Sequence, residues 1–198
     1  MDTFNESELV RALVTLPERS RVAFAVAAST RQLGNYERFA RNLGSAAVYR
    51  PREIVMQLWA DLSTMRVDRD MWSARLDEVT GLLPDEDEDW TIWHALADDA
   101  LSSLAYSIRC LLSLDAQESA WAARRAYEAA DQAAIRLLAA QPGLPNTEIQ
   151  IKLHPCVQRE LRRQKNDLAL LGAGSVEEIQ RQRPQDTLLT ESEAALLA

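Results

Sequence analysis

Two histidines and one carboxylate are the side chains of this 198-residue protein whose types and spacing come closest to a reactive site. His94 and Asp98 are four residues apart, which places them on one face of a helix, and His154 could join them from a distant segment. Divalent metals accept such a set of two imidazoles and one carboxylate, so a metal-dependent hydrolase that uses His94 and Asp98 is one hypothesis. The alternative is a hydrogen bond between His94 and Asp98 that satisfies a half-buried pair, with Asp99 facing water.

A run of five acidic residues directly precedes the segment that carries His94. The run consists of Asp85, Glu86, Asp87, Glu88 and Asp89. Residues 70–131 carry a net charge of −10, whereas residues 1–69 sum to +2 and residues 132–198 to zero. Such a field repels phosphate backbones and anionic lipids and attracts cations. We therefore predict a basic protein partner that binds this run, and neither nucleic acid nor a membrane; a solvated helix cap is the alternative.

The remaining polar motifs do not define a reaction. Arg159, Arg162 and Arg163 share a helical face, so they could bind phosphates or a carboxylate cluster; pairing with the acidic segment of the chain itself, or simple solvation, is the alternative. Cys110 and Cys156 lack metal-ligand spacing and are interpreted as small apolar residues in a reducing compartment. The sequence has no glycine-rich turn after a strand, no nucleophile elbow and no paired-cysteine zinc motif. It indicates no cofactor and no catalytic residue, and we interpret the protein as a binding module, with an enzyme as the alternative.

The element that must position His94 and Asp98 is a helix over residues 90–114. Its large apolar residues recur at spacings close to three and four, which is typical of a buried helix. They are Trp93, Leu96, Leu101, Leu104, Ile108 and Leu111. Because further apolar residues surround this stripe, we expect other helices to cover both sides, and we predict that this helix is the centre of the fold.

Similar patterns predict helices along the rest of the chain. Residues 116–140 include eleven alanines, which permit close packing, and they are expected to form an antiparallel hairpin with the central helix. Asn5 and Asp115 are predicted helix caps, and Gly34 is expected to interrupt a helix that begins near residue 18. No segment alternates with a period of two, so no strand is predicted. A loop is expected from Pro142 to His154.

These elements predict an all-α fold, a single-domain orthogonal or antiparallel bundle of about seven or eight helices around residues 90–114. The domain is expected to cover residues 1–184, and residues 185–198 form a tail that is either disordered or packed on a neighbour. The chain starts without a secretory signal, and the carboxylates of the central helix argue against a transmembrane span. We therefore expect a cytoplasmic protein; a homo-oligomer is compatible with the sequence.

Four segments, in their order and spacing, also carry a family resemblance over nearly the whole chain. They are RVAFAVAASTRQLGNYERFAR, VYRPREIVMQLW, WHALADDALSSLAYSI and HPCVQRELRRQKNDLALL. Together they resemble a YjaG-like bacterial family, the domain of unknown function 416. The resemblance implies an all-helical fold and brings no activity or catalytic residue. His94 departs from the family pattern, in which a proline is expected at the start of the central helix.

The negative charge of residues 70–131 fits both regulatory binding and neutralisation of a basic toxin, as by an immunity protein.

Overall fold

The computed structural model describes residues 1–85, 90–140, 147–182 and 186–197. This part of the chain contains ten helices and no strand, which confirms the predicted all-α class. The helices are α1 (Glu6–Val14), α2 (Glu18–Asn42), α3 (Arg50–Thr64), α4 (Arg69–Thr80), α5 (Ile92–Ser113), α6 (Ala116–Ala139), α7 (Glu148–Leu153), α8 (Pro155–Gly172), α9 (Val176–Gln182) and α10 (Glu191–Leu196). Among the helices described, none is long and apolar enough to cross a membrane.

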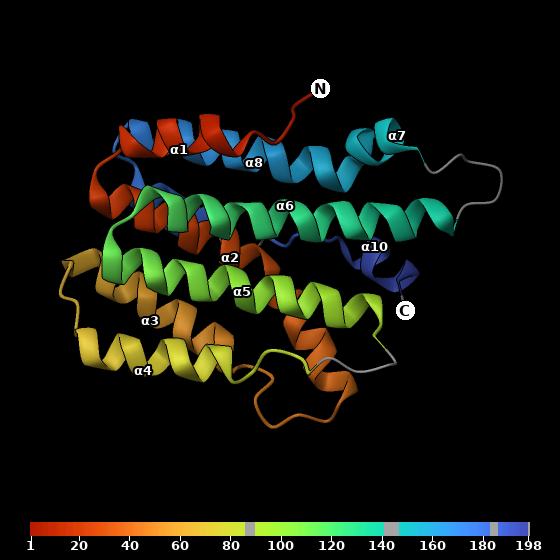
Figure 1. The fold of residues 1–198 in the computed structure, drawn as a ribbon, viewed down its shortest axis with the longest axis horizontal. Coiled ribbons are helices and arrows are strands. Elements are labelled where there is room, and N and C mark those ends of the chain that lie inside the picture. Colours follow the sequence, from red (N-terminus) through yellow and green to blue (C-terminus); the bar gives the residue numbers. More distant parts are fainter. Residues whose placement is uncertain (86–89, 141–146, 183–185, 198) are drawn as a thin grey trace.

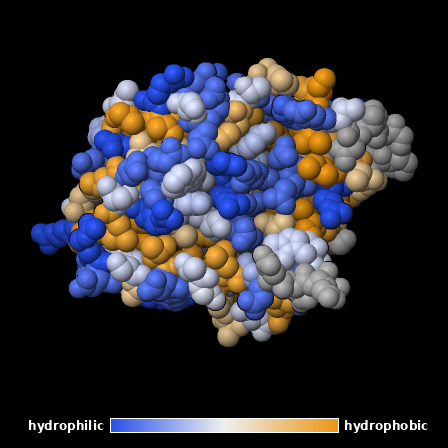
Figure 2. Space-filling model, in the orientation of Figure 1, coloured by the Kyte–Doolittle hydropathy of each residue, from blue (hydrophilic) through white to orange (hydrophobic). Residues whose placement is uncertain are grey.

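Helices α2, α5 and α6 pack against one another at the centre of the bundle (Figure 1). Helices α3 and α4 cover one side of this centre, and α1, α7 and α8 cover the other. Leu104 and Ile108 of α5 are fully buried, which confirms the buried helix predicted from the sequence. Helix α2 lies beside α5 and is buried along most of its length, so the two share the central position. On the face shown in Figure 2, hydrophilic and apolar residues are interspersed.

The alanines of α6 explain how three helices come so close together. Ala120, Ala123 and Ala130 are among the α6 residues that are completely buried. Small side chains let polar groups of neighbouring helices reach the α6 backbone. The Ser103 hydroxyl of α5 donates to a carbonyl of α6 at 2.9 Å, and Gln164 Nε2 of α8 donates to the Ala123 carbonyl at 3.0 Å. The antiparallel α5–α6 hairpin is thus held by packing and by hydrogen bonds to the backbone.

The structure differs from the sequence prediction at Gly34, where α2 continues without a break. Gly34 is exposed, while its neighbours Leu33 and Asn35 are buried. A glycine inside a helix costs about 1 kcal/mol relative to alanine. The packing of the long buried face outweighs this cost, so tertiary contacts decide the structure here.

Short helices account for the difference between the ten observed helices and the seven or eight predicted. Helix α7 occupies part of the expected loop, and its cap is made by Thr147, whose side chain accepts from the Gln150 amide. The predicted caps are confirmed for α1 and α6, where Asn5 accepts from the Glu8 amide and Asp115 accepts from the Gln117 amide.

Residues 186–197, here termed the C-terminal strap, lie across α2 and α8 of the same chain. The amide of Leu188 donates to the Arg31 carbonyl at 2.8 Å, and Leu188 is 1% exposed. Arg159 and Arg163 of α8 donate to strap carbonyls at 2.9 and 2.7 Å. The same two arginines pair with Glu193 and Asp186 of the strap, whereas Arg162 is exposed. Arg159 and Arg163 therefore pair within the chain, with carboxylates of the strap and not with the acidic segment considered from the sequence.

Candidate functional site at the start of helix α5

An open pocket lies beside the first turn of α5. It has a volume of about 330 Å³ and is formed by the second half of α2, the turn after α4 and the first turn of α5. Its lining includes Phe39, Leu43, Leu82, Asp85 and His94. Leu43 is 63% exposed, so it forms a solvent-exposed apolar part of the wall, whereas Phe39 is buried.

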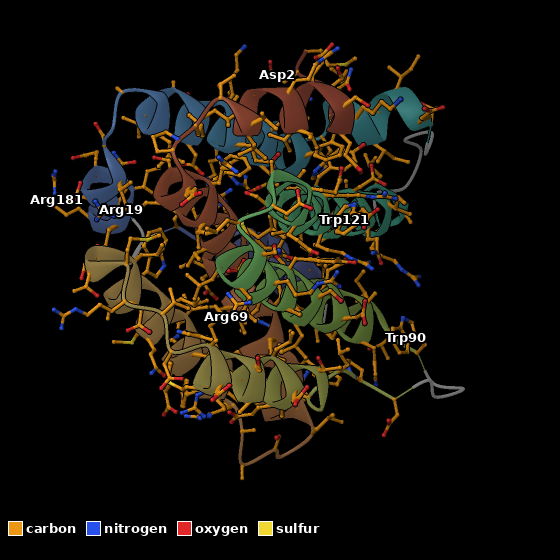
Figure 3. The ribbon with its side chains drawn as sticks, turned by 60° about the vertical axis from the view of Figure 1, so that its left-hand side comes forward. Asp2, Arg19, Arg69, Trp90, Trp121 and Arg181 are labelled. Atoms are coloured by element: carbon orange, nitrogen blue, oxygen red, sulfur yellow. The ribbon has the colours of Figure 1, made fainter. Side chains whose placement is uncertain are left out.

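Aromatic rings connect this pocket with a second one on the other side of the α5 start. The His94 ring packs edge-on against Phe39 with centroids 4.9 Å apart, and against Trp90 with centroids 5.4 Å apart. Trp90 is 41% exposed and stands at the edge of the molecule in Figure 3. It lines the second pocket, of about 290 Å³, together with Gln132 and Ile135 of α6. We call Leu43, Asp85, Trp90 and His94 the α5-start surface.

The acidic run predicted to bind a partner is only partly placed by the structure. Asp85 is exposed on the rim of the first pocket. It forms no ion pair with any residue that the structure describes. Residues 86–89 of the run lie outside the described residues.

His94 has a different local role from the one considered for a metal ligand. Its Nδ1 accepts a hydrogen bond from the Thr91 amide at 3.2 Å, which caps the first turn of α5. His154 lies at the junction of α7 and α8, on the far side of α6 (Figure 1), where its Nδ1 is 3.0 Å from Cys156 Sγ. Within the described ranges, no three or more His, Cys, Asp or Glu side chains are placed to hold a metal. The geometry therefore does not favour a metal site of His94, Asp98 and His154.

The two cysteines lie in buried, apolar surroundings, as predicted for small core residues. Burial raises the pKa of both Cys110 and Cys156 to about 12. For His154, burial lowers the pKa of the imidazole. The close contact between His154 and Cys156 therefore joins a neutral ring to a thiol, which is unsuited to nucleophilic catalysis.

Asp99 is buried, which corrects the expectation that it faces water. Its side chain is 1% exposed, and its two carboxylate oxygens accept from Arg125 at 3.1 Å and from Gln132 at 2.9 Å. Burial raises the pKa of Asp99 to about 7, against the opposing attraction of Arg125. Gln132 therefore links a carboxyl that titrates near neutral pH to the second pocket of the α5 start.

This titration predicts a pH-dependent stability. An unfolded aspartate has a pKa of about 3.9. Between about pH 4 and pH 7 the folded state therefore holds a proton that the unfolded state has lost, so the free energy of unfolding falls as the pH rises. We expect Asp99→Asn to flatten this fall, and chemical denaturation across that pH range measures it. A matched change at the exposed Asp70 should leave the slope unchanged, and equal slopes for wild type and Asp99→Asn would contradict the prediction.

A buried cluster of charges around Arg31 was not identified from the sequence. The Arg31 side chain of α2 is 1% exposed, and two of its nitrogens donate to the two oxygens of Glu160 at 3.0 Å each. A third nitrogen donates to Asp167 at 2.7 Å, and Asp186 of the strap lies 3.9 Å away. Burial alone opposes the charge, but Glu160 and Asp167 raise the pKa of Arg31 above its ordinary value. An arginine inside an otherwise apolar stripe is the signal that could have revealed this cluster.

The architecture and the α5-start surface define the class of this protein: an all-helical single domain with an exposed apolar and acidic surface at one end. The chain belongs to the family described as protein of unknown function (DUF416), whose model matches residues 8–185. This match confirms the family resemblance found in the sequence. A comparison with curated proteins finds no match.

A solved structure with the same fold also comes from this family. It is the crystal structure of a DUF416 family protein from Shewanella baltica OS155, which superposes with a TM-score of 0.73 at 14% sequence identity. The match covers 89% of this chain and 93% of the other. At this identity the similarity concerns the fold alone.

Proposed function

We propose that this protein is a binding module that recognises a basic protein partner through the α5-start surface. One observation carries the proposal: the carboxylate of Asp85, without an ion pair to any described residue, stands on the rim of a pocket whose wall includes the exposed side chain of Leu43. A basic side chain with an apolar stem fits this combination, because the charge can meet Asp85 while the stem covers the wall.

Asp85 differs from Glu78, the carboxylate near the end of α4. Glu78 pairs with Arg50 and Arg75, so its charge is neutralised within the chain. The sequence adds four acidic residues directly after Asp85. The exposed ring of Trp90 supplies the kind of aromatic contact that often contributes most to binding. A basic regulatory protein and a basic toxin would both present the basic side chains that this surface requires.

Salt-dependent association tests the proposed function. In the test variant Asp85 and Asp87 become Asn while Glu86 and Glu88 become Gln. We expect this variant to bind a partner captured by the wild-type protein more slowly, and to show a weaker dependence of the association rate on ionic strength. The reason is that steering by charges is screened over about 10 Å at 0.1 M salt and about 3 Å at 1 M. Stopped-flow or surface-based kinetics at several salt concentrations measures both quantities.

A matched variant controls for net charge. It loses four exposed acidic residues from other parts of the surface, namely Glu8, Glu18, Asp70 and Glu148. We expect it to keep most of the association rate, and both variants should melt close to the wild-type temperature. If the partner binds the Asp85 variant with the rate and salt dependence of wild type, the acidic run has only a local role at the start of α5.

A further inference from the structure

A second kind of site lies between α2, α3 and α9. This pocket has a volume of about 340 Å³, and its walls are the apolar side chains of Leu33, Val55, Met56 and Trp59. Arg52 and Gln180 also line it. Met56 is 67% exposed, whereas the other three apolar residues are almost completely buried. The pocket thus has an apolar floor, one flexible wall and a polar edge, which is the usual composition of a site for a small molecule.

This pocket is separate from the α5-start surface, although α2 contributes to both. Thr30 and Leu33 lie on the face of α2 that lines the pocket, and Glu37 follows on the same face. Phe39 of the same helix and Leu43, its C-cap, line the pocket at the α5 start. A ligand in one pocket therefore does not occupy the other.

Arg52 is held in place by a buried carboxylate. Its Nε donates to Glu37 at 2.5 Å, and Glu37 is only 7% exposed. The second oxygen of Glu37 pairs with Arg41 at 3.5 Å, so two guanidinium groups share one carboxylate and one positive charge is in excess. The two terminal nitrogens of Arg52 bond to no residue that the structure describes. An arginine oriented through Nε, with both terminal nitrogens available, can receive a carboxylate in a bidentate pair.

We propose that this pocket binds a small aliphatic carboxylate, with its charged end on Arg52 and its chain against Met56, Val55 and Trp59. The excess positive charge selects an anion over a cation or a neutral molecule. The apolar walls select a ligand with a hydrocarbon body over an inorganic anion. Gln180 offers a further polar group at the same edge from α9.

Octanoate and octan-1-ol form the matched pair of probes. Both have an eight-carbon chain, but only octanoate carries a charge. The readout is the indole N–H signal of Trp59 in nitrogen-15 NMR spectra, assigned with Trp59→Phe, because this group donates to Thr30 at the pocket. We expect octanoate to shift that signal and to bind at least about tenfold more tightly than octan-1-ol, as a charge-assisted hydrogen bond implies. Arg52→Gln should abolish this preference, whereas Arg41→Gln, which removes the excess charge but leaves both terminal nitrogens of Arg52 available, should only weaken it.

A third variant tests the apolar part of the site independently of charge. Met56→Trp adds bulk at an exposed position of the wall, so it should fold normally and weaken the binding of both probes. The proposal is overturned if octanoate leaves the Trp59 signal unchanged in the wild type. It is equally overturned if octan-1-ol binds as tightly as octanoate, or if Arg52→Gln and Arg41→Gln bind octanoate alike.

Discussion

Replacing Arg31 by methionine is expected to destabilise the protein by about 3 to 5 kcal/mol, the usual cost of removing one partner from a buried ion pair. The change leaves the carboxylates of Glu160 and Asp167 without their cation, and both are buried between α2 and α8. Methionine fills much of the volume of arginine, so the loss reflects the uncompensated charge more than a cavity. Urea denaturation followed by circular dichroism measures the free energy of unfolding.

Arg41→Met is the matched control, because Arg41 lies on the same helix with a side chain that is 52% exposed. It should cost less than about 1 kcal/mol, as expected for an exposed pair. A double variant, Arg31→Met with Glu160→Met, should recover part of the loss because one buried carboxylate is removed with the arginine. If Arg31→Met and Arg41→Met have equal effects, the buried cluster does not contribute in the way that its geometry indicates.

Leu104→Ala is expected to destabilise the protein by about 2 to 5 kcal/mol, as a deleted aliphatic side chain leaves a cavity in a packed core. Leu104 has no exposed surface and lies on α5, which packs against α2 and α6 at once. The alanines of α6 limit relaxation around the cavity, because their backbone is already in close contact with its neighbours. The same denaturation experiment gives the value.

Leu196→Ala is the control for this prediction, since Leu196 is 64% exposed on α10. Its effect should remain within about 0.5 kcal/mol, which is usual for a surface position. A loss below this limit for Leu104→Ala would show that the centre of the bundle is not packed as described.

The spacing of apolar residues and the helix-capping residues was sufficient to predict the helices that depend on residues near in the sequence. The spacing of Leu96, Leu104 and Ile108 predicted a buried α5, and the alanines after Ala116 predicted its antiparallel partner. Caps such as Asn5 are local too, because donor and acceptor are three residues apart in the sequence.

Features that depend on distant partners could not be predicted in the same way. The continuity of α2 through Gly34 follows from burial against other helices, which outweighs a local propensity. Arg31 is buried because Glu160 and Asp167 of α8 surround it, and neither is close in sequence. His94 and Asp98 have the spacing of a site, but the fold leaves His154 at the junction of α7 and α8, so the three side chains do not come together, and His94 Nδ1 accepts from the Thr91 amide.

The structure of the C-terminal strap also depends on partners that are distant in the sequence. Its sequence has no clear helical stripe, yet Leu188 and Leu189 are buried because α2 and α8 provide a surface for them. The arginines of α8 that hold the strap are typical of a solvated face when only their own helix is considered. Their role emerges from the carboxylates of Asp186 and Glu193, which the fold brings to them.

The position of Arg31 also has a consequence for the order of events during synthesis. Glu160 follows Arg31 by 129 residues, so α2 leaves the ribosome long before α8 can supply the carboxylates. Until then the guanidinium of Arg31 has no carboxylate partner, and the side of α2 that faces α8 stays uncovered. The packing around α2 is therefore completed late, and a growing chain that ends before α8 keeps an exposed apolar face that chaperones can bind.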